Sequence, residues 1–125
     1  MISTDNGTTW TSRTSGTSNQ LKGATFGNNT FLAVGDSGTI LTSSDNGTSW
    51  TVRTPAKSEV VNGITFGNNT FVTWGYSGTL QTSSDNGTSW TWHETNIGAE
   101  LGAGTFGNGV FVLKSRDYGY TLRST

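Results

Sequence analysis

The residues of this chain that could carry out chemistry are few and dispersed. There is one histidine, His93, and a carboxylate follows it at Glu94. A single His-Glu pair supplies too few ligands for a metal ion and too few groups for a catalytic triad. Three of the eight acidic residues belong to a repeated motif, which leaves few for the paired carboxylates of a glycosidase. We expect no catalytic residue, no metal and no cofactor, and predict that the chain is not an enzyme.

A different set of residues could bind a small molecule. Aromatic and acidic side chains occur where the copies of an internal repeat differ, at Asp36, Trp74, Tyr76, Trp92, Asp117 and Tyr118. Aromatic rings stack on the C–H faces of sugars, and carboxylates accept hydrogen bonds from sugar hydroxyls. These residues therefore form a candidate ligand face for glycans. The alternative is that Trp74 and Trp92 only fill gaps between sheets, because another copy has valine at both positions.

Composition limits the partners and the class of fold. Only 12% of residues are charged and the formal net charge is −1, so nothing attracts the chain to nucleic acid or to an anionic membrane. No cysteine is present, so disulfides are excluded and the compartment stays unknown. We find no signal peptide and no apolar run of membrane-spanning length, and expect a soluble chain. Gly, Ser, Thr and Asn are abundant, which favours short strands and tight turns.

These residues are organised by an internal repeat with an offset of 40 residues. One motif reads STDNGTTW at 3–10 and SSDNGTSW at both 43–50 and 83–90. A second motif keeps the same offset, with TFGNNTF at 25–31 and 65–71 and TFGNGVF at 105–111. Turn signals divide each copy into four segments of strand length. In one copy these segments are roughly 21–26, 30–34, 39–43 and 49–54.

The segment 30–34 is apolar on both faces of its predicted sheet. Phe31 and Ala33 lie on one face, and Leu32 and Val34 lie on the other. A sheet of this kind must be covered on both sides, and stacking against copies of itself provides the cover, as in the blades of a β-propeller. The sequence thus predicts an all-β fold made of four-stranded antiparallel blades, three per chain.

The pattern S-x-D-x-G-x-[ST]-W gives the sequence a resemblance to the Asp-box, or BNR-type, β-propeller family over essentially its whole length. The matching residues are Asp5, Gly7, Trp10, Asp45, Gly47, Trp50, Asp85, Gly87 and Trp90. The resemblance implies that the box is a structural hairpin between the third and fourth strands of a blade, distant from catalytic centres. Sialidases share this architecture, but no motif in this sequence places their arginine cluster, their tyrosine and glutamate pair or their acid/base residue.

The repeat begins and ends within a blade. Residues 119–125 (GYTLRST) match 38–44 (GTILTSS), and MIST at 1–4 maps onto the end of the same stretch. The predicted segments are 1–14 (third and fourth strands), 15–54 (a blade), 55–94 (a blade) and 95–125 (first to third strands). Because propellers close with about four to eight blades, three blades per chain predict a six-bladed ring of two chains. The alternative is an excised fragment of a longer propeller.

In such a homodimer, the N-terminal strand of each chain would complete the last blade of the other and remove open sheet edges. Met1–Thr4 and Leu122–Thr125 are candidates for the same strand, so one of them should fray. The leading hypothesis is a non-enzymatic, self-assembling propeller module whose partner is a second copy. A lectin-like glycan-binding protein is the second hypothesis, and a sialidase-like glycosidase is the third.

Overall fold

The computed structural model describes all 125 residues, and β-strands account for nearly all of its regular structure. Eleven strands form three antiparallel sheets, and the helical segments are two three-residue 3-10 turns, Asp36–Gly38 and Tyr76–Gly78. None of the helical segments has the length and apolar character needed to cross a membrane. The predicted all-β class is therefore confirmed.

The first two sheets each contain four strands in sequence order. Sheet 1 consists of β1 (Leu21–Gly27), β2 (Thr30–Gly35), β3 (Ile40–Ser43) and β4 (Thr51–Arg53). Sheet 2 consists of β5 (Val61–Gly67), β6 (Thr70–Gly75), β7 (Leu80–Ser83) and β8 (Thr91–His93). The fourth strand is shorter than predicted, because the residues before Thr51 belong to the turn that joins it to β3.

Sheet 3 has only three strands, in the order β11, β10, β9. They are β9 (Leu101–Gly107), β10 (Val110–Ser115) and β11 (Thr121–Arg123). Strand β11 pairs with β10 in the register in which β3 pairs with β2, because Leu122 lies opposite Leu113 as Leu41 lies opposite Ala33. The outer edge of β11 has no neighbouring strand, so its backbone groups are open to pairing.

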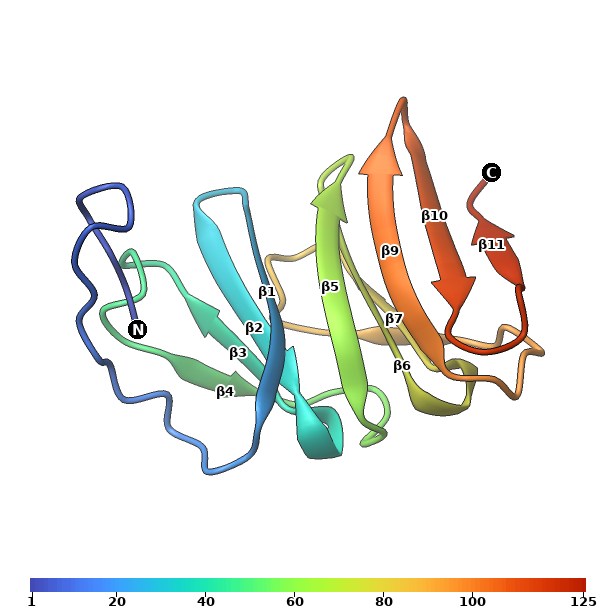
Figure 1. The fold of residues 1–125 in the computed structure, drawn as a ribbon, viewed down its shortest axis with the longest axis horizontal. Helices are drawn as coiled ribbons and strands as arrows, with labels where there is room; N and C mark the ends of the chain where they lie inside the picture. Colours follow the sequence, from blue (N-terminus) through green and yellow to red (C-terminus); the bar gives the residue numbers. More distant parts are fainter.

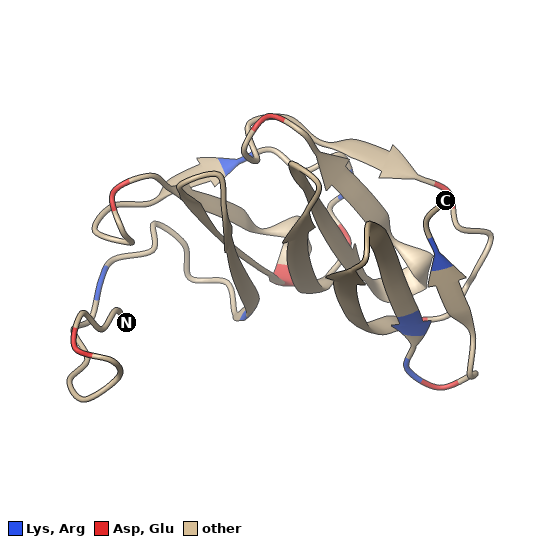
Figure 2. Cartoon of the chain, turned by 90° about the horizontal axis from the view of Figure 1, so that it is seen from above, with Lys and Arg blue, Asp and Glu red and all other residues tan.

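The N-terminal residues form a separate small hairpin. Its only strand-like pairing is an isolated bridge between Ile2 and Thr11, with both backbone hydrogen bonds at 2.8 Å. This hairpin lies beside sheet 1, at one end of a row of sheets whose other end is β11 (Figure 1). The two chain termini are therefore at opposite ends of the row, as Figures 1 and 2 both show.

Apolar side chains fill the two spaces between neighbouring sheets. Leu32, Val34 and Ile40 of sheet 1 pack against Val61, Ile64 and Phe71 of sheet 2. A second cluster joins Trp74 of sheet 2 to Leu101 and Leu113 of sheet 3. Each fully buried side chain of this size contributes about 1.5 to 3 kcal/mol. Sheet 2 is thus covered on both faces, as its sequence predicts.

Candidate functional site

The three DNG hairpins (residues 3–10, 43–50 and 83–90) are closed networks of local hydrogen bonds. In the second hairpin Asp45 accepts from the Ser43 hydroxyl at 2.8 Å and from the Ser49 backbone N–H at 2.9 Å. The Gly47 N–H donates to Ser43 Oγ at 2.9 Å, and Trp50 Nε1 donates to the Gly47 carbonyl at 3.1 Å. Gly47 has φ of +78°, a conformation that glycine adopts without strain. The side chains of Ser43, Asp45 and Trp50 therefore hold the hairpin in its shape.

Hydrogen bonds lower the pKa of the hairpin carboxylates. The pKa of Asp5, Asp45 and Asp85 falls from 3.8 to about 2 in each case. The largest cause is the hydroxyl of Thr9, Ser49 or Ser89, which donates to the carboxylate, and the backbone N–H of the same residue comes next. A carboxylate in this state stays ionised at neutral pH, so it cannot act as a general acid.

The hairpins also hold neighbouring sheets together. Gly87 of the third hairpin is buried, and a Cβ there would lie 2.7 Å from Leu32 Cδ2 and 2.9 Å from Thr42 Cγ2. Gly47 stands in the same relation to Ile2, whose Cγ2 would lie 2.8 Å from such a Cβ. Ile2 therefore takes the place that Thr42 takes one repeat later. The N-terminal hairpin thus occupies the position of the third and fourth strands of a sheet before sheet 1.

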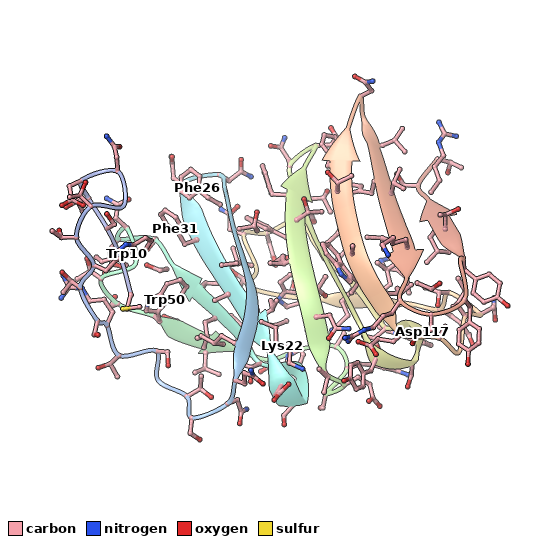
Figure 3. All side chains as sticks on the ribbon, in the orientation of Figure 1. Trp10, Lys22, Phe26, Phe31, Trp50 and Asp117 are labelled. Atoms are coloured by element: carbon pink, nitrogen blue, oxygen red, sulfur yellow. The ribbon has the colours of Figure 1, made fainter.

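The first hairpin has no sheet to cover. Trp10 is 59% exposed, whereas Trp50 and Trp90 are partly buried. Trp90 packs against the cluster between sheets 1 and 2. No sheet lies on the outer side of the first hairpin to supply such a cluster for Trp10. Figure 3 shows Trp10 in the N-terminal hairpin, at the outer end of the row of sheets. A large aromatic surface is therefore available at this end of the molecule.

The opposite end carries an apolar groove, which we call the β11 groove. It has a volume of about 290 Å³ and lies between sheets 2 and 3. Its apolar lining consists of Val72, Leu80, Phe111, Leu113 and Leu122. Between sheets 1 and 2, Trp90 packs at the corresponding position. The groove is open because sheet 3 has no fourth strand and no tryptophan of its own there.

Phenylalanine rings and glycines form a second repeated contact between sheets. The ring of Phe66 lies against Gly27, and the ring of Phe106 lies against Gly67, where a Cβ would collide with each ring. At each end of the row, one residue of this repeated contact has no partner within the chain. Phe26 is 50% exposed, near the end of β1 (Figure 3). Gly107 has no atom within 4 Å of a potential Cβ.

One charged residue interrupts the repeated apolar contacts. Lys114 on β10 occupies the position of Val34 on β2 and Trp74 on β6, both of which are buried between sheets. Lys114 is exposed on the outer face of sheet 3. This face is therefore less apolar than the corresponding faces of sheets 1 and 2.

Two polar networks lie at the starts of β1 and β5, and the first includes Asp36 and Tyr76 of the candidate ligand face. Lys22 Nζ lies 2.9 Å from Asp36 Oδ1 and 5.5 Å from the centre of the Tyr76 ring. The hydrogen bond to Asp36 is the main reason why the pKa of Lys22 rises. Lys22 lies within a strand and belongs to none of the repeated motifs. Its variation among the copies, where it corresponds to Asn62 and Gly102, was the available signal.

The second network joins sheets 2 and 3. Glu100 Oε1 accepts from Asn62 Nδ2 and from Arg116 Nη1, both at 2.9 Å. Asn62 also donates to the Leu101 carbonyl at 2.9 Å. Charges elsewhere are scattered over the surface (Figure 2). Because each acidic group in the two networks has a basic partner, these networks leave no excess charge at the end of the sheets.

The structure does not unite the predicted ligand residues. Trp74 is only 5% exposed and packs between Gly63 and Gly104, so it is a packing residue. Trp92 remains accessible on the outer strand, with Lys57 Nζ 4.0 Å from the centre of its ring. Tyr118 follows Asp117 in the sequence and is exposed, and its ring pairs with that of Tyr120. No hydrogen bond or aromatic contact links Asp36 and Tyr76 to Trp92 or Tyr118.

Comparisons with known proteins add no family and no relative. No protein-family model matches the chain, and no curated protein matches its sequence. The resemblance to Asp-box propellers therefore stays a prediction from the repeated motif. Side chains that ligate metals do not gather in groups of three or more.

Proposed function

We propose that this chain is a non-enzymatic, self-assembling propeller module of the Asp-box type, and that two copies close a six-bladed ring. One observation carries the proposal: the two ends of the row of sheets hold complementary parts of one sheet. Sheet 3 has a first, second and third strand but no fourth. The N-terminal hairpin has the position of a third and fourth strand but no first or second.

The positions of the ends favour assembly between copies. Because the termini lie at opposite ends of the row (Figure 1), the N-terminal hairpin is remote from β11 of its own chain. A second copy supplies the missing strand at each end and pairs the open edge of β11. Two such contacts related by a twofold axis close the assembly without leaving a free edge.

Apolar side chains are exposed on the free faces at both ends of the row. Phe26 and Leu21 are exposed on the face of sheet 1 that has no neighbouring sheet. Val112 is exposed on the free face of sheet 3, beside the unfilled space at Gly107. Burying these apolar side chains removes exposed hydrophobic surface, which is the main favourable term in protein association.

The native mass of the 125-residue chain tests this proposal. Light scattering during size exclusion should give twice 13.2 kDa across a dilution series. A monomer at all accessible concentrations would overturn the proposal. A trimer or an open series of larger species would also overturn it, because neither is a ring of two chains.

A second candidate function is glycan binding, and one feature favours it. A cavity of about 250 Å³ lies beside Trp92 and is also lined by Lys57, Ser77, Glu94 and Asn96. An accessible indole next to a carboxylate and an amide suits a sugar ring and its hydroxyls. A glycan array should show binding that Trp92→Ala removes. No binding to any glycan would eliminate this candidate, and so would binding that Trp92→Ala leaves unchanged.

A further inference from the structure

We propose that the β11 groove is the receptor for the N-terminal DNG hairpin of a second copy, with Trp10 in the groove and Thr11–Arg13 paired to β11. The inference rests on the proposed self-assembly and goes beyond it. It assigns the third strand of the shared sheet to β11 and requires Met1–Ser3 to leave that place. It also makes the first DNG hairpin a site built by two chains.

The contact between sheets 1 and 2 is the template for the occupied groove. There Gly87 lies against Leu32 and Thr42, and Trp90 packs on the adjoining apolar cluster. One repeat later, the positions of Leu32 and Thr42 are taken by Val72 and Thr82, which both line the β11 groove. The repeat places Gly7 and Trp10 of the second copy against them. The groove and the exposed indole of Trp10 would thus form the same kind of contact that Gly87 and Trp90 make with sheet 1.

The strand register follows from the same template. Leu41 on β3 lies opposite Val52 on β4. The corresponding residues are Leu122 on β11 and Ser12 in the N-terminal segment. Pairing of Ser12 with Leu122 of a second copy therefore gives sheet 3 its fourth strand in the register of sheets 1 and 2.

Two segments compete for the third strand, and β11 is held more firmly. Three residues of β11 pair with β10, and Leu122 packs against the second apolar cluster. Ser124 adds a backbone hydrogen bond to the Phe111 carbonyl at 3.0 Å and accepts one from the Phe111 N–H at 2.9 Å. At the other end, Met1 is 80% exposed, and Ile2 makes a single bridge and a packing contact with Gly47. Displacing Met1–Ser3 therefore breaks fewer contacts than displacing β11.

The exchange leaves the polar groups of the hairpin satisfied. Ser3 Oγ donates to Asp5 at 2.7 Å and accepts from the Gly7 N–H at 2.9 Å. By the repeat, Ser124 corresponds to Ser43, which makes the same two bonds in the second hairpin. Ser124 of one copy therefore takes over the role of Ser3 toward Asp5 and Gly7 of the other.

Cysteine cross-linking tests the assignment, because the chain contains no cysteine of its own. The double variant Ser12→Cys with Leu122→Cys places two thiols at a non-hydrogen-bonded antiparallel pair, where Cα atoms are about 4.5 Å apart and disulfides form readily. We expect a disulfide-linked dimer under mild oxidation. A closed ring consumes all four thiols of the dimer, whereas an open pair leaves two free.

The control is the double variant Ile2→Cys with Val112→Cys. It reports the rival arrangement, in which Ile2 pairs with β10 of a second copy and β11 is displaced. In the repeat, Ile2 corresponds to Thr42 and Val112 corresponds to Leu32, and these two residues lie opposite each other in sheet 1. Cross-linking of this pair in place of the first would overturn the inference. A dimeric mass with neither cross-link would overturn the inference and leave the proposed function standing. A monomeric mass would remove the proposed function itself.

The side chain in the groove is tested separately. Trp10→Ala should weaken dimerisation by at least about 30-fold, as expected of a buried aromatic anchor, while Trp10→Phe should retain most of the affinity. Tyr118→Ala is the matched control, because Tyr118 is an exposed aromatic residue outside the groove. Equal affinities for Trp10→Ala and the unmodified chain would contradict the assignment of Trp10 to the groove.

Discussion

The ring of Phe66 lies against the backbone of Gly27, in a space that a side chain on residue 27 would fill. The same contact recurs 40 residues later between Phe106 and Gly67. Each contact joins the first strand of one sheet to the turn at the end of the first strand of the preceding sheet. The repeat fixes a phenylalanine on one side and a glycine on the other. A row of sheets therefore ends with one unpaired phenylalanine, Phe26, and one unpaired glycine, Gly107.

The free glycine gives a variant that should separate folding from assembly. Gly107→Val adds a side chain where the single chain has open space, so the fold should be retained. If Phe26 of a second copy occupies this space, the valine collides with its ring and the chain becomes monomeric. Light scattering measures the mass, and circular dichroism checks the fold. Gly98→Val is the control, because Gly98 also has open space and lies in a loop. A dimer of Gly107→Val would refute the contact.

The hairpin tryptophans should differ in their contribution to the stability of the single chain. In the Gly107→Val background, Trp50→Ala should lower the free energy of unfolding by about 2 kcal/mol, less than the roughly 3 to 5 kcal/mol of a fully buried tryptophan. Trp10→Ala should lower it by less than about 1 kcal/mol, because Trp10 is largely exposed. Urea unfolding followed by circular dichroism measures both values. Equal losses would contradict the difference in burial.

Acid should destabilise the protein in a defined range of pH. The pKa of Asp5, Asp45 and Asp85 is about 2 in the fold and 3.8 as the ordinary value. Since the unfolded state binds protons more tightly, the ionised carboxylates stabilise the fold fully above about pH 4. This contribution is lost as the pH falls through about 2.

The variant Asp85→Asn tests the cause of this acid sensitivity. It should melt at a lower temperature than the unmodified chain at pH 6, because an amide is a weaker acceptor for the Ser89 hydroxyl and N–H. The difference in melting temperature should shrink between pH 4 and pH 2, because over this range the carboxyl of Asp85 becomes protonated in the unfolded state while it is still largely ionised in the fold. A difference that stays constant over this range would show that the carboxylate charge does not stabilise the fold.

The charge at Lys114 should weaken the association of two copies. It stands where Val34 and Trp74 are buried between sheets, and burying an ammonium group without a partner is unfavourable. Lys114→Val should therefore tighten dimerisation by about tenfold, which corresponds to about 1.4 kcal/mol. Sedimentation velocity across a dilution series measures the change. Weaker association would mean that Lys114 finds a partner in the dimer.

The sequence determined the elements whose contacts are local. Asp45, Gly47 and Trp50 form their hairpin through hydrogen bonds that span four residues or fewer, so spacing along the chain was enough to predict them. The apolar residues of β2 likewise predicted a strand with an apolar side chain on each face, and Leu32 and Val34 of one face pack against sheet 2. The groups of the hairpin are neighbours in sequence, and so are the alternating residues of β2, so backbone geometry fixes where these side chains point.

Only the tertiary structure decided which residues meet across sheets. Trp74 is an aromatic residue of the type that stacks on ligands, yet it is buried because Gly63 and Gly104 leave room for its indole. The exposure of Trp10 and the β11 groove likewise depend on which sheet faces are covered. Contacts such as that of Trp74 with Gly104 join residues of different sheets, and their distances depend on the side-chain volumes of both sheets. Near-identical repeats therefore specify identical hairpins, while the first and last members of each series differ because a neighbouring sheet is missing.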